Sequence, residues 1–151
     1  MEGNQIELRC VLELLAKPKE MAVDALKKIL ANVEEEGSKL EISDATYSEP
    51  KKVEQDFYSA FATFKIKADP VAAFGFILDY APSSAEVHNA KDIKLSVTDL
   101  QAILNDISGR LNQMDQNIKM FSAQNVILTN ENAQLKKKLG QENVQIPTDK
   151  S

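Results

Sequence analysis

The chain has 151 residues, of which 43% are hydrophobic and 27% are charged, with no tryptophan and one cysteine. This composition is typical of a folded, water-soluble chain, and no apolar run approaches the roughly 18 residues that a membrane-spanning helix needs. One cysteine excludes an intrachain disulfide, and the first residues lack the pattern of a secretory signal. We therefore expect a cytoplasmic protein without membrane contact.

The negative charge is concentrated in the first part of the chain. Residues 1–95 carry 17 acidic and 12 basic side chains, whereas residues 96–151 carry six of each. Phosphate backbones are bound by clustered lysine and arginine. The charge distribution therefore disfavours nucleic acid as a partner.

The first elements follow clear patterns. Ile6–Leu14 alternates between apolar and mostly polar residues, which predicts a strand with one buried face. From Pro18 to Val33 apolar residues recur every three or four positions, which predicts a helix that Pro18 opens and Gly37 caps.

Two further strands follow, over Lys39–Tyr47 and Phe57–Lys67, with a turn-like segment at 48–52 between them. They predict a hairpin with a long or irregular connection. Asp69 is the expected cap of a second helix that starts at Pro70 and is broken by residues 81–84. A short fourth strand is expected within 85–95, at either Glu86–His88 or Ile93–Leu95.

The order strand, helix, strand, strand, helix, strand resembles the ferredoxin-like (split βαβ) unit, which is an α+β fold. This resemblance implies an antiparallel four-stranded sheet with two helices on one face, spanning residues 1–95. The other face is then open. It would display Val11, Phe57 and Phe61, which we consider a candidate surface for sheet-face interactions.

Residues 96–140 predict one long helix, capped by Ser96 or by Thr98, with residues 141–151 as a flexible tail. Apolar residues follow one another in steps of four and three, the heptad repeat of a left-handed coiled coil. The a positions are Leu104, Leu111, Ile118, Asn125, Asn132 and Leu139, and the d positions are Leu100, Ile107, Met114, Phe121, Leu128 and Leu135. These twelve residues are the predicted oligomerisation site.

Asn125 and Asn132 favour a parallel homodimer, because each can hydrogen-bond its own counterpart at a only when two identical helices are in register. The flanking charges agree with this pairing: Arg110 at g would face Asp115 at e of the partner, and Glu131 would face Lys136. An antiparallel or higher-order bundle, or a helix folded back on its own domain, are the alternatives.

The stretch 124–139 resembles a leucine zipper, and this resemblance implies pairing of two helices. In zipper transcription factors a basic segment precedes the zipper and enters the major groove of DNA. Here the preceding residues 98–106 are acidic and apolar, so DNA binding does not carry over.

Residues suited to catalysis or metal binding are scarce. His88 is the sole histidine and Cys10 the sole cysteine, so the spacings of a zinc site do not occur. The five glycines are scattered, without a phosphate-binding loop, and no Gly-x-Ser-x-Gly elbow is present. We therefore expect no enzymatic activity, catalytic residue, metal or cofactor, and interpret Cys10 as buried and His88 as a surface residue.

Two other hypotheses rest on the order of elements. RRM domains share this order, and residues 57–64 partly match the motif on their third strand, at Ala60, Phe61 and Phe64, without its leading Lys/Arg-Gly pair. Metabolite-sensing ACT domains also resemble it. The leading prediction is a non-enzymatic homodimer for assembly or interaction with an unidentified protein. The alternatives are a small-molecule sensor and an RNA-associated protein that uses the open face.

Overall fold

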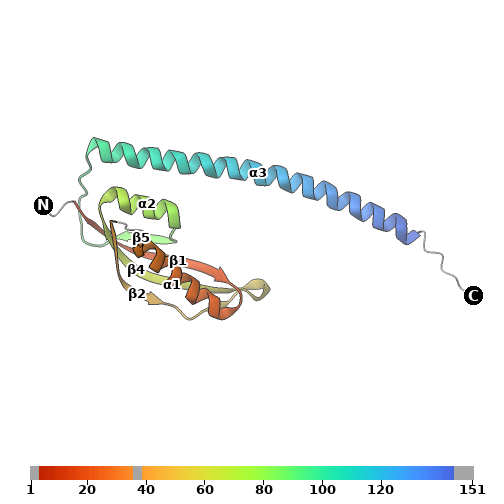
Figure 1. Ribbon diagram of the computed structural model, residues 1–151, viewed down its shortest axis with the longest axis horizontal. Coiled ribbons are helices and arrows are strands. Elements are labelled where there is room, and N and C mark those ends of the chain that lie inside the picture. Colours follow the sequence, from red (N-terminus) through yellow and green to blue (C-terminus); the bar gives the residue numbers. More distant parts are fainter. Residues whose placement is uncertain (1–3, 36–38, 145–151) are drawn as a thin grey trace, which may run out of the picture. The chain divides into compact units, whose positions relative to one another are not determined.

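The computed structural model describes residues 4–35 and 39–144, with only the backbone for residues 142–144 (Figure 1). The predicted cap Gly37 and residues 145–151 of the predicted tail lie outside the described residues. The chain divides into two compact units, Met1–Ile107 and Ser108–Ser151. We call them the α+β unit and the helical unit, and each is considered by itself.

The elements are β1 (Ile6–Ala16), α1 (Lys19–Glu35), β2 (Leu40–Tyr47), β3 (Lys51–Lys52), the short 3₁₀ helix η1 (Glu54–Asp56), β4 (Tyr58–Ala68), α2 (Pro70–Tyr80), β5 (Ser84–Val87) and α3 (Val97–Val144). The sheet has the strand order β2-β4-β1-β5, with β3 paired to β4, and all pairs are antiparallel. A mixed α+β fold with a long C-terminal helix is thereby confirmed. β3 was not predicted, and within the described residues it raises the number of strands in the sheet from four to five.

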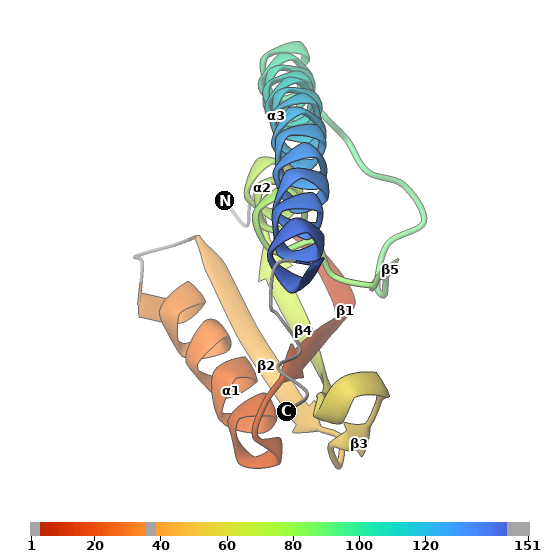
Figure 2. The ribbon, with the colours of Figure 1, turned by 90° about the vertical axis from the view of Figure 1, so that its right-hand side faces the viewer.

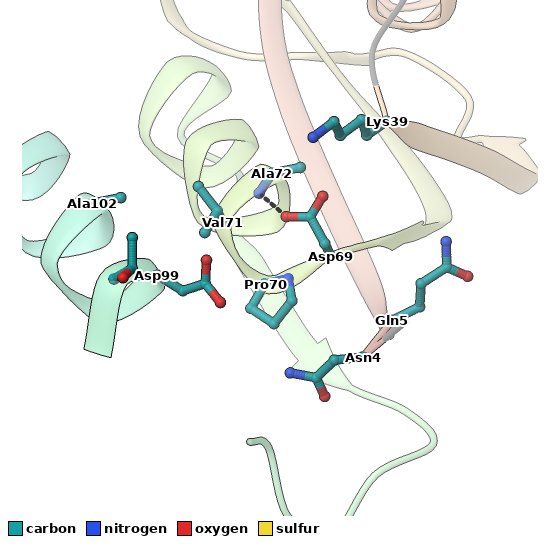
Figure 3. A pocket seen from close by; sticks show the side chains of 10 residues that line it. Asn4, Gln5, Lys39, Asp69, Pro70, Val71, Ala72, Asp99 and Ala102 are labelled. Carbon is teal, nitrogen blue, oxygen red and sulfur yellow. Dashed lines mark hydrogen bonds between the residues drawn. The ribbon is translucent and has the colours of Figure 1, made fainter. Parts of the chain in front are cut away.

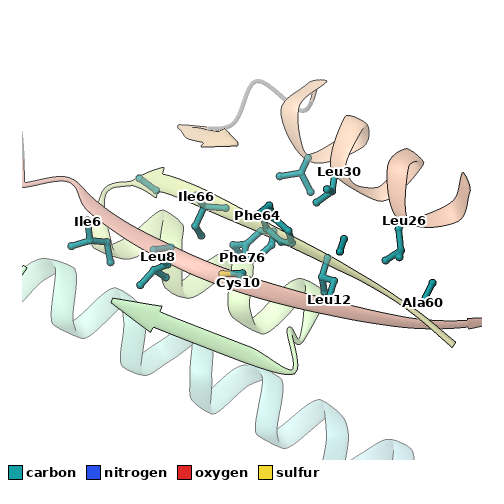
Figure 4. Packing of buried hydrophobic residues seen from close by; sticks show 14 of the residues in the cluster. Ile6, Leu8, Cys10, Leu12, Leu26, Leu30, Ala60, Phe64, Ile66 and Phe76 are labelled. Atoms are coloured by element: carbon teal, nitrogen blue, oxygen red, sulfur yellow. The ribbon is translucent and has the colours of Figure 1, made fainter. Parts of the chain in front are cut away.

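One hydrophobic core lies between the sheet and two helices (Figure 4). β1 and β4 pair in a register that sets Cys10 opposite Phe64 and Leu12 opposite Ala62, so the even-numbered residues of both strands point to the same face. Those residues pack with Leu26 of α1 and with residues of α2. Both helices therefore cover one face of the sheet, and the opposite face is left for polar side chains.

Local signals account for the ends of α2. The Asp69 carboxylate accepts a hydrogen bond from the backbone N–H of Ala72 at 2.9 Å, and Pro70 occupies the first turn, as predicted. At the other end Ala81 adopts a left-handed conformation with φ of 45°, and its N–H donates to the carbonyl of Ile77. The predicted break at residues 81–84 is confirmed.

The connection from β2 to β4 is irregular, and the prediction for Phe57 was wrong. Gln55 and Asp56 both have positive φ, 60° and 63°, and turn the chain through η1. The N–H of Phe57 donates to the carbonyl of Glu54 in this turn, so β4 begins one residue later, at Tyr58. β3 and η1 form a small extension at one end of β4 (Figure 2).

The fourth major strand, β5, forms at the first of the two predicted places. It pairs with residues 8–11 of β1, and the N–H of His88 donates to the carbonyl of Glu7 just beyond it. Ile93–Leu95 is not a strand.

α3 starts where the sequence places it, but its boundaries differ from the prediction. Ser96 is the cap, because its hydroxyl oxygen accepts a hydrogen bond from the N–H of Asp99 at 3.0 Å. At the other end the helix continues past Gly140 to Val144. Its first turns, as far as Ile107, belong to the α+β unit.

Candidate interaction surfaces

The predicted coiled-coil positions beyond Ile107 are exposed in the single chain. We call these residues the seam: Leu111, Met114, Ile118, Phe121, Asn125, Leu128, Asn132, Leu135 and Leu139. The seven apolar side chains among them are 55–61% exposed. A row of large apolar side chains in contact with water marks an interaction surface.

The first turns of α3 present a different face to their own unit. Ile103 is only 3% exposed, and Ile107 is partly buried, whereas Leu100 and Leu104 are 45% and 52% exposed. Ile107 therefore serves the α+β unit as well as the predicted repeat, and the seam proper begins at Leu111. Sequence reasoning missed Ile103, although an isoleucine four residues before Ile107 is a signal for a second apolar face.

The open face of the sheet is mainly polar. Lys65 lies 3.2 Å from Asp44 and 3.8 Å from Glu7 on this face. Val11 is opposite Thr63 and Phe61 is opposite Glu13, so the two predicted apolar residues are diagonal neighbours and both are partly buried.

Phe57 is 41% exposed and lies just before β4, where its backbone is extended and its carbonyl accepts a hydrogen bond from the N–H of Val53. Leu15, which the sequence analysis did not single out, has the same parity as Val11 on β1 and is 59% exposed. Stacking of RNA bases on neighbouring strands needs aromatic side chains on both. The residues of β1 beside Phe61 are Val11 and Glu13, and neither is aromatic. The RNA hypothesis therefore stays a prediction.

A cleft of about 520 Å³ lies in the α+β unit where α2 and α3 begin (Figure 3). Asp69 is turned back onto the Ala72 amide, and Asn4 donates to the carbonyl of Lys94. Asp69 thus caps α2, and Asn4 ties the N-terminal segment to the segment that precedes α3. Pro70 and Ala102 supply apolar walls. The arrangement offers structural hydrogen bonds rather than a set of groups converging on a ligand.

The described residues lack two other kinds of feature, a cluster of metal ligands and a membrane-spanning helix. Within 4–35 and 39–144, no three histidine, cysteine, aspartate or glutamate residues lie together as potential metal ligands. In the same part of the chain, no helix is both long and apolar enough to cross a membrane.

Cys10 and His88 lie where the sequence analysis expected them. Cys10 lies on β1, which is flanked by β4 and β5, and its side chain is fully buried. This burial raises the pKa of its thiol from 9.0 to about 11. His88 is exposed directly after β5. A buried neutral thiol is a weak nucleophile, so Cys10 acts as a small core residue.

The raised pKa of Cys10 predicts a loss of stability at high pH. Above pH 9 the unfolded chain releases the thiol proton, while the folded protein retains it up to about pH 11, so unfolding becomes more favourable as pH rises through this window. We expect the free energy of unfolding to fall more between pH 8 and pH 10.5 for the native chain than for Cys10→Ala. Urea titrations at both pH values measure this, and equal losses in the two proteins would contradict it.

Comparison with known families shows to which family the chain belongs. The model of the MJ0538 family matches residues 7–146, which covers the α+β unit from β1 onwards and the whole of α3. The chain belongs to the MJ0538 family. Because the match includes both units, α3 is part of what defines the MJ0538 family rather than an addition to this member.

Neither the curated proteins nor the solved structures give a significant match to the chain. The name of the MJ0538 family states no activity or partner, so function is argued from the residues of the two units.

Proposed function

We propose that the protein is a non-enzymatic, cytoplasmic homodimer that serves as an assembly and protein-interaction module. Two helical units pair in parallel as a coiled coil and join two α+β units, whose surfaces together receive a further protein. The observation that carries the proposal is the uninterrupted heptad repeat of the seam, with its apolar residues more than half exposed.

The α+β unit is, in this proposal, ferredoxin-like. The strand order β2-β4-β1-β5 with antiparallel neighbours supports this assignment, as does the packing of α1 and α2 on one face. β3 and η1 are then an insertion in the hairpin between the second and third major strands.

Burial of the seam supplies the driving force for pairing. Each fully buried leucine, isoleucine or phenylalanine contributes roughly 1.5–3 kcal/mol, so a side chain that is still more than half exposed offers about 1 kcal/mol on pairing. Seven such residues in each chain lie along about 42 Å of helix, from Leu111 to Leu139. In proteins most of the stability of a helix comes from packing its apolar face against another element.

The two asparagines support parallel pairing. In a parallel coiled coil a residues face a residues, so Asn125 meets Asn125 of the partner and Asn132 meets Asn132. In an antiparallel coiled coil a residues face d residues. Every d residue of this helix is apolar, from Leu100 to Leu135, so each asparagine amide would be buried without a partner, at about 1–3 kcal/mol.

The charges beside the seam contribute less. Asp115 already forms an ion pair with Lys119 of the same helix at 2.6 Å, and both side chains are exposed. Its predicted contact with Arg110 of the partner would compete with this pair. Glu131 with Lys136 of the partner is the better candidate for selecting alignment, although exposed pairs contribute only about 0.2–1 kcal/mol.

Sedimentation of the full chain and of a chain ending at Ile107 tests the proposal. We expect the full chain to be a dimer at low micromolar concentration and the shortened chain to be a monomer. The cut after Ile107 retains Ile103 and should preserve the tyrosine fluorescence of the α+β unit. A full-length monomer would refute the proposal, and a dimer of the shortened chain would move the interface to the α+β unit.

A further inference from the structure

The predicted repeat extends into the first turns of α3, which belong to the α+β unit. We call the exposed apolar residues of the repeat in these turns the proximal stripe: Val97, Leu100 and Leu104. Val97 precedes Leu104 by seven residues, so it takes an a position one heptad before the first a residue of the sequence analysis. The three side chains are 86%, 45% and 52% exposed. Like the seam, the proximal stripe is in contact with water.

The α+β unit holds α3 through a different face of the helix. Ile103 is 3% exposed, and Asp99, Ala102 and Ile107 are partly buried. Asp99 and Ala102 line the cleft beside the start of α2 (Figure 3). At 3.6 residues per turn, the middle of this buried face lies about one third of a turn around the helix from the middle of the proximal stripe. A second helix can therefore lie on the proximal stripe without displacing the unit from α3.

The positions that flank the proximal stripe favour an identical helix in register. In a parallel coiled coil the e and g positions lie beside the partner. From residue 96 to residue 108 these positions hold four uncharged residues: Ser96, Gln101, Ile103 and Ser108. The charged residues of this stretch, Asp99 and Asp106, both take the c position, away from the partner. The first charge at a flanking position is Arg110, which faces an acidic e residue. Pairing of these turns therefore brings no like charges together.

We propose that the parallel coiled coil continues from the seam through the proximal stripe to Val97, so that the first turns of α3 pack against the same turns of a second copy of the chain. The inference rests on the proposed dimer, and it adds how the two α+β units are held. Each α3 is bound by its own unit through Ile103 and by the partner helix through the proximal stripe. The two units are therefore fixed to the beginning of the coiled coil rather than carried on separate stalks.

Continuity with the seam supports this extent. α3 is one helix from Val97 to Val144, and Ile107 at d connects the proximal stripe to Leu111 at a without a gap in the repeat. Two helices that pair in this register at Leu111 are already aligned at Leu104. If the pairing ended at Leu111, the helices would diverge where each of them still presents exposed leucines.

The symmetry of the pair places the two α+β units on opposite sides of the coiled coil. Each unit contacts its own helix beside the g position of Ile103, and a two-fold axis along a parallel coiled coil relates the two g sides. Ile93 and Leu95, which are 39% and 37% exposed, directly precede the proximal stripe. Both copies of this segment therefore come together at one end of the coiled coil, and a protein that binds there contacts both chains.

The proximal stripe is too short to form a dimer by itself. It spans about two helical turns, and pairing over such a length is marginal without further support. The chain that ends at Ile107 is therefore still expected to be a monomer at low micromolar concentration. The proximal stripe extends a pairing that the seam provides.

Disulfide cross-linking of cysteine variants of the full chain tests the inference. Val97→Cys and Ile118→Cys each place a thiol at an a position, whereas Gln116→Cys places it at f, on the outer side. A disulfide requires Cα atoms within about 7 Å, which helices in register provide at a. With a mild oxidant at low micromolar concentration, we expect Val97→Cys and Ile118→Cys to form covalent dimers to similar extents and Gln116→Cys to form few. The buried Cys10 stays unreactive.

The two a positions separate this inference from the proposed function. Val97 lies about 21 Å from Leu111 along α3, so helices that part at Leu111 would keep the thiols of Val97→Cys too far apart to react. Cross-linking of Ile118→Cys without cross-linking of Val97→Cys overturns this inference alone. Absence of cross-linking in Ile118→Cys removes the proposed parallel dimer as well.

Val97→Asp combined with Leu104→Asp measures what the proximal stripe adds to affinity. Both side chains are exposed in the single chain, so the α+β unit should keep its tyrosine fluorescence. We expect the dissociation constant of the dimer, measured by sedimentation, to rise at least about tenfold, because each substitution sets two carboxylates against each other across the coiled coil. Asn112→Asp with Asn130→Asp adds the same charge on the outer side and should change the constant by no more than about twofold. Equal dissociation constants for the two variants would overturn the inference.

Discussion

Ile118→Asp combined with Leu128→Asp will abolish self-association at micromolar concentration, raising the dissociation constant of the dimer about 1,000-fold or more. In the parallel coiled coil each substitution sets two carboxylates against each other across the seam, one pair at an a position and one at a d position. Such groups lose hydration and repel, at several kcal/mol in all, and 4.1 kcal/mol corresponds to a 1,000-fold change. Sedimentation velocity of the full chain measures the result.

A control with the same change of charge separates this effect from general repulsion. Asn112→Asp with Asn130→Asp adds two carboxylates per chain on the outer side of the helix, where both residues are exposed. This variant should remain a dimer at low micromolar concentration. If the seam variant also remains a dimer, the helical unit is not the interface, and the predicted heptads describe an amphipathic helix that serves another purpose.

Much of the α+β unit could be predicted because its signals are local. The alternation along Ile6–Leu14 reflects the period of a strand with one buried face, and the structure places the even-numbered residues in the core. Asp69 followed by Pro70 is a helix start that needs no knowledge of the rest of the fold. Caps and periodicity of this kind are determined by neighbours a few residues away.

The errors fall where the backbone departs from regular geometry. Phe57 follows an alternating pattern with the strand after it, but positive φ at Gln55 and Asp56 starts the strand one residue later. Neither residue is glycine, so sequence alone did not mark a turn there. The choice between two places for the fourth strand depended on its pairing with β1, which is a contact between residues far apart in the chain.

The candidate surfaces likewise combine features that local sequence predicts with features that depend on tertiary packing. Heptad spacing identified the seam without a structure, because the repeat is local and uninterrupted from Leu100 to Leu139. The point at which the seam becomes available depended on tertiary packing. Burial of Ile103 and partial burial of Ile107 assign the first turns of α3 to the α+β unit. Exposure of Leu15 likewise required the register of β1.

Phe64→Ala will lower the free energy of unfolding of the α+β unit by about 3–5 kcal/mol. Phe64 is 1% exposed, and its ring meets that of Phe76 edge to face at 5.9 Å, so removal of the ring leaves a cavity and breaks an aromatic contact. Domains of this size have a total stability of about 5–15 kcal/mol. The substitution therefore removes a large share of it.

Urea titration of the full chain, followed by tyrosine fluorescence, measures this loss without interference from the helical unit. All three tyrosines lie in the α+β unit, and Tyr80 stacks on Phe76 at 5.0 Å, next to the site of the change. Phe61→Ala is the matched control, since it removes the same ring from the opposite face of β4, where Phe61 is only partly buried. We expect it to cost about 1 kcal/mol. An equal cost for the two substitutions would mean that the open face is covered in solution, and Val11 and Phe61 would then belong to a second interface rather than to a free surface.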